Sequence, residues 1–219
     1  IRHCAAAEIE TVSITTVTRH NIDELEQIHA ELGEAGATLW QVQLGVPQGN
    51  LADDPEAIVG RDEIVALLPR LAAIKSSGRR PQPYPADNVG YYGPHEEELR
   101  GQGKRLPFWI GCRAGLEVLG IESNGNVKGC LSLPSELNGR TDFVEGNIRE
   151  RPLAEIWTDP EAFAYNRNFE PEQLQGECRD CEWGEICRGG CTWTSTAHHG
   201  QPHRFSQCYY LHSKGEDRS

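Results

Sequence analysis

The first hundred residues alternate between two strand-like and two helix-like patterns of hydrophobic and polar positions. The β-branched run "ETVSITTVT" at 10–18 predicts a buried strand, and "ATLWQVQLGVP" at 37–47 predicts another. Apolar residues recur at helical spacing between these runs and again over 61–75. This order predicts parallel strands joined by right-handed crossovers. Because two such repeats cannot close a sheet, we assign residues 1–95 to the late part of a larger barrel or open α/β domain.

Single residues predict where the two helices begin and end. The first helix should begin at Asn21, because Glu24 three positions later completes a capping-box pattern. It can end at Gly36. The second helix should be kinked or shortened at Pro69, which lacks a backbone N–H for the helical hydrogen bonds.

The second half of the chain has little regular periodicity. The segment at 115–133 alternates on both sides of the Asn-Gly pair at 124–125, which predicts a β-hairpin with a type I′ turn. Short helices are expected after Pro152 and from the Asp-Pro pair at 159–160. A region with so small a periodic core needs another source of stability, and metal ligation supplies it in other domains of this size.

A stretch rich in Pro, Gly and charge separates the two halves and predicts a connector. Its tyrosine pair at 91–92 favours loop packing over a substrate contact. The expected divisions of the chain are 1–95, a connector at 96–111, a cluster-binding domain at 112–212 and a tail at 213–219.

Composition and charge exclude several classes of partner. The chain has 219 residues and a formal net charge of −12, which gives it no general reason to bind nucleic acid or an anionic membrane. No apolar run approaches the roughly 18–20 residues that span a bilayer. The sequence opens on Ile1 and contains no Met, so we expect the C-terminal fragment of a longer, cytoplasmic protein.

Seven of the eight cysteines lie between residues 112 and 208. Four of them form a C-x2-C-x5-C-x3-C run within "GECRDCEWGEICRGGC" at 176–191. Disulfides are typical of small secreted chains, and a Cys4 zinc site usually pairs two C-x2-C units, whereas this run has one. Iron–sulfur ligation fits better, because a run of close cysteines can divide its thiolates between two clusters. Gly189 and Gly190 would let backbone N–H groups approach a cluster, and a tight turn is compatible with the same role.

The spacing of the seven cysteines resembles the signature of the SPASM domain, the auxiliary-cluster module of many radical S-adenosylmethionine (SAM) enzymes. The pattern runs from Cys112 through Gly125-x4-Cys130 and the cysteine run to Cys208. "GNIRERPLAEIW" at 146–157 also resembles a segment of such domains. The resemblance implies an α/β fold, in which the C-terminal portion of a partial (β/α) TIM-like barrel is followed by a small irregular α+β iron–sulfur domain with a β-hairpin.

The resemblance, carried over residue by residue, implies two auxiliary [4Fe–4S] clusters. The ligands of the outer cluster would be Cys178, Cys181, Cys187 and Cys208. The ligands of the inner cluster would be Cys112, Cys130 and Cys191. The inner cluster is then one ligand short.

Several residues are candidates for that fourth position, which can also be open or taken by solvent or substrate. Glu117 is one, and the histidine pair at 198–199 is another, although the sequence favours two exposed surface histidines as the account of that pair. Val118 stands in the region where some relatives supply an eighth cysteine. Arg179 and Arg188, beside the ligands, would offset the negative cluster charge or serve as solvated surface cations.

The sequence departs from the family in two places. The C-x3-C-x2-C motif that holds the SAM-cleaving cluster is absent, since Cys4 is the only cysteine before Cys112, so this chain alone is expected to be inactive. Leu131 follows Cys130, where sulfatase-maturing relatives place an aspartate, and this favours modification of a ribosomal precursor peptide over formylglycine formation.

The function implied for the intact enzyme is hydrogen abstraction from a peptide or protein substrate. It would use SAM, a third [4Fe–4S] cluster and an external electron donor, with the auxiliary clusters in electron transfer or substrate engagement. No residue of this chain is assigned a catalytic role. The alternative is a stand-alone iron–sulfur electron-transfer or peptide-binding module without catalysis.

Overall fold

The computed structural model describes residues 1–101, 108–137, 141 and 143–214. The chain divides into two compact units, one formed by 1–109 with 207–219 and the other by 110–206. Residues 102–107 of the expected connector and 215–219 of the expected tail lie outside the described residues. The domain boundaries expected from the sequence stay a prediction.

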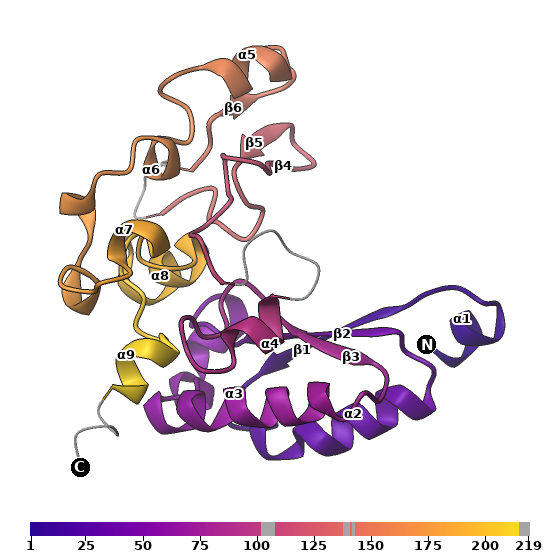
Figure 1. Ribbon diagram of the computed structural model, residues 1–219. Helices are drawn as coiled ribbons and strands as arrows, with labels where there is room; N and C mark the ends of the chain where they lie inside the picture. Colours follow the sequence, from indigo (N-terminus) through magenta and orange to yellow (C-terminus); the bar gives the residue numbers. More distant parts are fainter. Residues whose placement is uncertain (102–107, 138–140, 142, 215–219) are drawn as a thin grey trace. The chain divides into compact units, whose positions relative to one another are not determined.

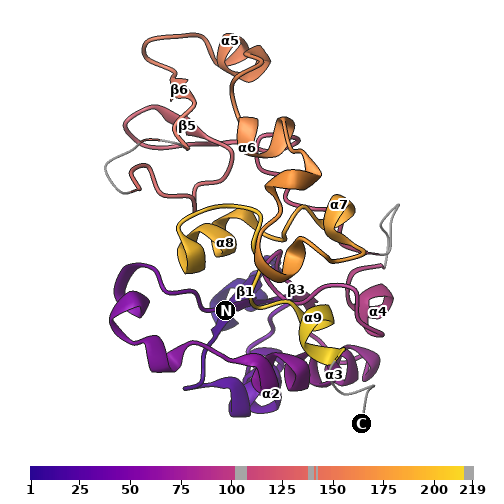
Figure 2. The ribbon, with the colours of Figure 1, turned by 90° about the vertical axis from the view of Figure 1, so that its left-hand side faces the viewer.

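The first unit is built on a sheet of three parallel strands in the order β1–β2–β3. The strands are β1 (Val12–Val17), β2 (Leu39–Leu44) and β3 (Gln82–Pro85). Figures 1 and 2 show the two long helices, α2 (Leu25–Glu34) and α3 (Arg61–Ser76), on the same side of this sheet. The parallel arrangement predicted from the sequence is therefore confirmed, and among the described residues the sheet is open rather than closed into a barrel.

One face of the sheet forms the core of the first unit. Trp40, Val42 and Leu44 alternate along β2 and are fully buried. They belong to one hydrophobic cluster with the apolar stripe of α3, whose buried members are Ile64, Leu67, Leu68, Leu71, Ala72 and Ile74. The opposite face carries Val12 and Ile14, which are 52% and 61% exposed. The helices thus cover a single face.

The predicted start of the first helix and the predicted shortening of the second need correction, whereas the first helix ends just before Gly36 as expected. Asn21 does not cap the first helix: its side chain accepts a hydrogen bond from the Thr18 amide at 2.9 Å and donates one to the Thr16 carbonyl at 3.0 Å. A short 3₁₀ turn, η1 (Ile22–Glu24), follows, and the α-helix begins only at Leu25. In α3, the buried apolar stripe extends on both sides of Pro69, and the helix continues through the proline to Ser76.

Shorter elements complete the first unit. They are α1 (Arg2–Ala6), η2 (Gly49–Asp53), η3 (Pro55–Ala57), α4 (Glu96–Arg100) and α9 (Tyr209–Ser213). Tyr91 is fully buried and stacks on Trp109, with ring centroids 4.7 Å apart. Tyr92 donates a hydrogen bond to the Trp109 carbonyl at 2.7 Å. These contacts agree with the expectation that the tyrosine pair at 91–92 packs within the loop.

The second unit contains a small antiparallel sheet and several short helices. The sheet consists of β4 (Gly120–Ile121), β5 (Asn126–Lys128) and β6 (Gly146–Asn147). The helices are α5 (Leu153–Thr158), α6 (Ala164–Arg167), η4 (Pro171–Gln173), η5 (Gly176–Cys178), α7 (Gly184–Cys187) and α8 (Thr192–His199). Its apolar centre is small and includes Val127, Ile156 and Phe163.

The predicted hairpin is present, but its turn is different from the predicted one. The Gly125 amide bonds the Glu122 carbonyl and the Glu122 amide bonds the Asn126 carbonyl, each at 2.9 Å. Gly125 has a φ of +96°, whereas Asn124 is not among the residues with positive φ. A type I′ turn needs positive φ at both central positions, so that prediction is wrong. The helix expected from Asp159 is also wrong, because α6 begins only at Ala164.

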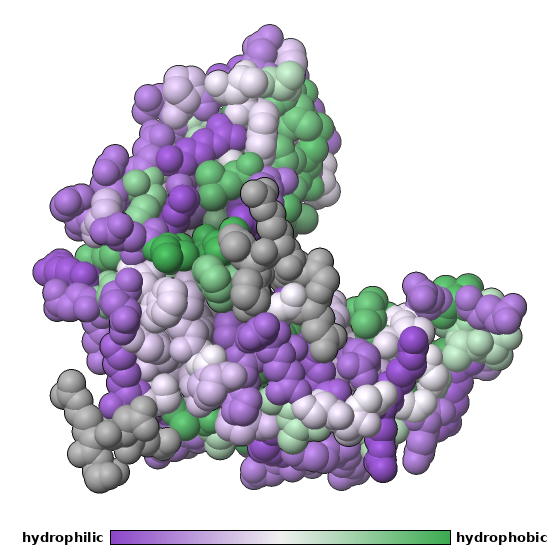
Figure 3. All heavy atoms as spheres, in the orientation of Figure 1, coloured by the Kyte–Doolittle hydropathy of each residue, from purple (hydrophilic) through white to green (hydrophobic). Residues whose placement is uncertain are grey.

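The second unit exposes apolar side chains on and beside its β-hairpin. In the second unit, Val118, Ile121 and Leu131 are exposed, and Figure 3 shows hydrophobic surface over the β4–β5 hairpin. Within the described ranges, no helix combines the length and the hydropathy that a membrane span requires.

Candidate functional site

The predicted cluster ligands fall in both units. Cys208 belongs to the first unit, and the other six of the seven-cysteine pattern belong to the second. All eight cysteines lie within the described ranges, and none is in a disulfide bond. The thiol groups therefore stay available as metal ligands.

The first two cysteines of the run lie next to each other on a tight turn. Cys178 ends η5 and is buried, and the Cys181 amide bonds its carbonyl at 3.3 Å. The Phe205 amide donates a hydrogen bond to the Cys178 sulfur at 3.4 Å. Burial raises the pKa of Cys178, and the Phe205 amide partly opposes that effect. An N–H group aimed at a sulfur is the contact that stabilises a thiolate ligand.

The other two cysteines of the run flank a left-handed stretch of backbone. Arg188, Gly189 and Gly190 have φ values of +58°, +75° and +80°. A Cβ at Gly189 would lie 2.4 Å from the backbone of His203, and one at Gly190 would lie 2.6 Å from the Phe205 ring. Glycine is required here by both conformation and space, so the tight-turn role is present in the structure.

The upstream cysteines lie on segments that meet within the second unit. Gly129 directly precedes Cys130, and a Cβ there would lie 2.9 Å from the Gly115 amide nitrogen. Gly111 directly precedes Cys112, and a Cβ there would lie 3.3 Å from the Cys187 carbonyl oxygen. The Cys112 segment therefore lies close to both the hairpin and the cysteine run.

A buried lysine fixes the hairpin next to Cys130. Lys128 is 2% exposed, and its ammonium bonds Glu122 Oε1 at 2.8 Å and Ser135 Oγ at 3.0 Å. It also donates to the Leu133 carbonyl at 2.5 Å. Hydrogen bonds to the Glu122 carboxylate, first from Lys128 and then from the Ser135 hydroxyl, lower the pKa of Glu122 to about 2. The ammonium thus ties the loop after Cys130 back to the strand before it.

The candidate fourth ligands of the inner cluster differ in how far they are exposed to solvent. Glu117 is 57% exposed and forms an ion pair with Arg113. The histidines at 198 and 199 end α8 and are partly buried, so the prediction of two exposed surface histidines is wrong. Burial lowers the pKa of His199.

Tyr165 is a residue that the sequence reasoning missed. It lies in α6, its oxygen is shielded from solvent, and its O–H donates to no acceptor among the described residues. Burial, then Glu145, then Cys112 and Cys130 raise its pKa above the ordinary value. The only sequence signal was its isolation, because no other tyrosine stands between Tyr92 and Tyr209.

The two arginines beside the ligands differ. Arg188 donates to the Asn166 carbonyl at 3.2 Å, and its guanidinium lies 5.7 Å from the centre of the Phe169 ring. Arg179 is exposed and makes a long contact of 3.4 Å with the Leu174 carbonyl. Arg188 is therefore partly held by the fold, whereas Arg179 has the character of a surface cation.

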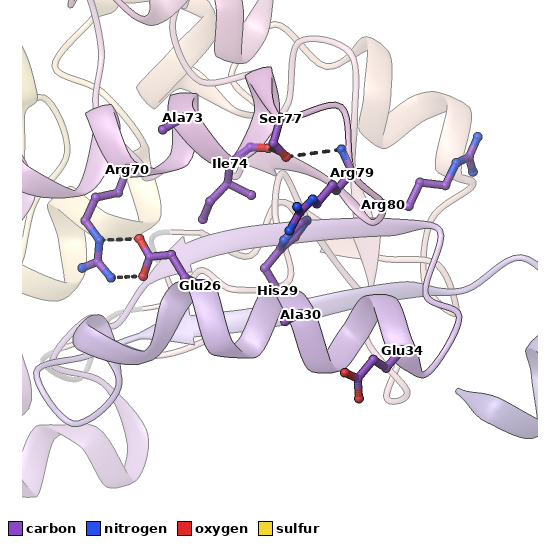
Figure 4. A pocket seen from close by; sticks show the side chains of 10 residues that line it. All are labelled: Glu26, His29, Ala30, Glu34, Arg70, Ala73, Ile74, Ser77, Arg79 and Arg80. Atoms are coloured by element: carbon purple, nitrogen blue, oxygen red, sulfur yellow. Dashed lines mark hydrogen bonds and ion pairs between the residues drawn. The ribbon is translucent and has the colours of Figure 1, made fainter.

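Cavities outside the cysteine segments are present in both units. One, of about 380 Å³, is lined in the second unit by Phe143, Glu145 and Tyr165 among others, and burial raises the pKa of Glu145. Another, of about 550 Å³, lies between α2 and α3 in the first unit. Figure 4 shows Glu26 and Arg70 joined as an ion pair at one end of it, and the guanidinium lowers the pKa of that carboxyl.

The donor set can be tested against an iron–sulfur group. Within the described ranges, no group of three or more Cys, His, Asp or Glu side chains is close enough to hold a single metal ion. The thiols come together in smaller sets, with Cys178 beside Cys181, and with Cys112 and Cys130 both near Tyr165. Buried thiols, glycines that permit close backbone approach and an orphaned phenol beside two of the thiols suit a cluster bound by thiolates.

Comparison with known proteins adds independent support. Residues 112–182 match the model of the SPASM family, described as an iron–sulfur cluster-binding domain. An AdoMet-dependent heme synthase of Methanosarcina barkeri is 27% identical over 183 residues, which cover 80% of this chain and 49% of that protein. The mycofactocin maturase MftC of Mycobacterium ulcerans is 29% identical over 194 residues, covering 87% and 47%. The chain thus spans about half the length of the curated relatives it matches.

Solved structures resemble the fold over nearly the whole chain. Streptococcus suis SuiB bound to S-adenosylmethionine aligns with a TM-score of 0.61 at 16% identity, covering 94% of this chain and 47% of SuiB. The protein anSMEcpe with bound AdoMet aligns with a TM-score of 0.61 at 15% identity, covering 96% and 52%. Residues 112–182 thus match the SPASM iron–sulfur domain, and in sequence and fold the chain resembles the part of radical SAM proteins that carries this domain.

Proposed function

We propose that this chain is the C-terminal part of a radical SAM enzyme that modifies a peptide or protein, and that it binds two auxiliary [4Fe–4S] clusters. The observation that carries the proposal is the SPASM match over residues 112–182, which begins at Cys112 and includes Cys130, Cys178 and Cys181. The open three-stranded sheet of the first unit supports its assignment to a partial TIM-like barrel, because its uncovered face carries apolar residues that a larger barrel would shield.

The chain's own residues would divide between the two clusters as the family pattern implies. The outer cluster would be held by Cys178, Cys181, Cys187 and Cys208. The inner cluster would be held by Cys112, Cys130 and Cys191. The Phe205 amide would stabilise the Cys178 thiolate, and Lys128 would hold the Cys130 loop in position. When bound, SAM with its cluster supplies a radical that abstracts a substrate hydrogen, and the auxiliary clusters offer an acceptor for the electron that the substrate then loses.

The names of the relatives support a peptide substrate, and they also support a second class of substrate. MftC is named a maturase, and SuiB has been solved bound to the precursor peptide SuiA. However, several relatives are named heme synthases, and another is a pre-heme d1 synthase. A tetrapyrrole is therefore the second candidate substrate. Titration of the reconstituted chain with an iron porphyrin, followed by the Soret band, against titration with a fluorescent precursor peptide would distinguish the two.

The cluster assignment predicts the iron content of cysteine variants. Anaerobic reconstitution should give about eight irons per chain, the sum of two four-iron clusters. Cys191→Ala and Cys130→Ala should each lose the inner cluster and keep the outer one, whereas Cys187→Ala should damage the outer cluster. Cys4→Ala is the matched control, because Cys4 lies outside the seven-cysteine pattern, and it should keep all the iron.

Iron counts and electron paramagnetic resonance (EPR) spectra of these variants check the assignment. If Cys191→Ala resembles Cys187→Ala and leaves the Cys130 cluster intact, the crossed assignment is wrong. Stoichiometric zinc with negligible iron would overturn the cluster proposal altogether.

The proposal also predicts what this chain does not do alone. Without the C-x3-C-x2-C motif it should form no 5′-deoxyadenosine from SAM, even when its auxiliary clusters are reduced. Sustained product formation by the purified chain would contradict this. A stand-alone electron-transfer or peptide-binding module is the alternative, and it is favoured if a longer protein containing the motif does not exist.

A further inference from the structure

We propose that the phenol of Tyr165 donates a hydrogen bond to the inner auxiliary cluster and thereby raises the reduction potential of that cluster. This inference rests on the proposed ligation by Cys112 and Cys130. It adds a positioning and tuning residue that belongs to no part of the seven-cysteine pattern.

The first observation is that Tyr165 has a buried hydroxyl whose O–H donates to no acceptor among the described residues. The Gly129 backbone N–H approaches the phenol oxygen as a donor and lowers the pKa of Tyr165 slightly, which leaves the hydroxyl proton without an acceptor. An unsatisfied buried hydroxyl is destabilising, and buried tyrosine hydroxyls usually have a partner. The ring is fixed edge-on against Phe143, with centroids 5.2 Å apart and planes at 81°.

The second observation is where this hydroxyl lies. A Cβ at Gly129 would fall 2.1 Å from the phenol oxygen, so the hydroxyl rests on the backbone directly before Cys130. The same Cβ would lie 3.0 Å from the Ala114 carbonyl carbon, which is two residues after Cys112. The hydroxyl therefore stands where the two cysteine-bearing segments meet.

The third observation is that α6 is anchored on the Cys112 segment by the two residues after Tyr165. Asn166 donates from Nδ2 to the Ala114 carbonyl at 2.7 Å, and Arg167 donates from Nε to the Gly115 carbonyl at 2.8 Å. Asn166 is 1% exposed. These bonds hold the phenol in one place relative to Cys112, whether or not its own hydroxyl is bonded.

Glu145 is the competing acceptor, and the geometry disfavours it. Its Oε1 is also buried and without a partner among the described residues, so the carboxylate oxygen and the phenol do not bond each other. The sulfur atoms of a cluster held by Cys112 and Cys130 would supply the missing acceptor. Hydrogen bonds to cluster sulfurs stabilise the more negative, reduced state and so raise the potential.

The experiment compares Tyr165→Phe with the wild-type chain after anaerobic reconstitution. We expect the same iron content, an altered EPR signal of the inner cluster and a reduction potential shifted to more negative values. Two control variants test whether the change is specific to the Tyr165 hydroxyl. Glu145→Gln removes the nearby charge and leaves the phenol, and Tyr84→Phe removes a phenol that bonds Gln41 in the first unit at 3.0 Å. Neither should reproduce the Tyr165→Phe change in the EPR signal.

A second measurement does not depend on the variant. In the wild-type chain, electron–nuclear double resonance before and after exchange into D₂O should reveal an exchangeable proton coupled to the inner cluster, and this coupling should be missing from Tyr165→Phe. An unchanged EPR signal and potential in Tyr165→Phe overturn the inference. Loss of about half the iron also overturns it, because Tyr165 would then be a ligand rather than a donor. A wild-type chain that binds no iron refutes the proposed function, and this inference with it.

Discussion

The buried ammonium of Lys128 provides a sharp test of how the second unit holds Cys130. The substitution Lys128→Met keeps most of the side-chain volume but removes the charge and every hydrogen bond to Glu122, Ser135 and Leu133. We expect both the stability of the hairpin and the occupancy of the inner cluster to fall, because the loop after Cys130 loses its tie to β5.

The size of the effect follows from burial. Removing one partner of a buried ion pair costs about 3–5 kcal/mol. The Lys128 side chain is 2% exposed, but that of Glu122 is 24% exposed and can regain water, so we expect about 3 kcal/mol. For a unit of this size such a loss lowers the melting temperature by roughly 12 °C or more.

The assay combines denaturant unfolding with hydrogen-exchange mass spectrometry, which reports the β4–β5 hairpin separately from the first unit. Lys75→Met is the matched control: Lys75 is only half-buried and bonds the Leu99 carbonyl at 2.8 Å, so its loss should cost no more than about 1 kcal/mol. The double variant Lys128→Met with Glu122→Gln should recover part of the loss, since it leaves no uncompensated carboxylate. If Lys128→Met unfolds within about 1 kcal/mol of wild type and its hairpin exchanges at the wild-type rate, the reasoning is wrong.

Three further outcomes can be checked on the same protein. Gly189→Ala should destabilise the second unit by roughly 2 kcal/mol or more and lower its iron content, because the left-handed φ is unfavourable for alanine and its Cβ would lie 2.4 Å from the His203 backbone; wild-type iron content in a normally folded variant would refute this. Asn166→Ala should cost about 2 kcal/mol in denaturant unfolding, because it leaves the buried Ala114 carbonyl without its donor, and an unchanged midpoint would contradict it. The stability that Glu122 contributes should be fully present above about pH 4.5 and lost as the pH falls toward 2, because folding lowers its pKa from 4.5 to about 2; urea unfolding across that range tests the sign, and Glu122→Gln should lack this loss.

The sequence alone determined the features that depend on local spacing. Period-two and helical patterns were enough to predict β1, β2 and the buried stripe of α3, because each element buries one face whatever its partners are. They did not predict β3, which lies in the Pro-rich stretch expected to be a connector. Cysteine spacing was enough to predict the SPASM resemblance, because seven cysteines and a glycine at these intervals rarely coincide by chance. The assignment of each cysteine to a cluster stays a prediction, since it rests on the family pattern.

Tertiary structure decided the features that depend on what lies opposite a residue. Asn21 bonds the Thr18 amide and the Thr16 carbonyl at the end of β1 and does not cap the helix. The hairpin turn is not type I′, since the bonds of Glu122 shape the loop. Tyr165 and Lys128 carry no motif, and their roles arise only because the chain brings them against the segments of Cys112 and Cys130. Burial turns an ordinary phenol or ammonium into a group that must find a partner, and burial is a property of the folded chain.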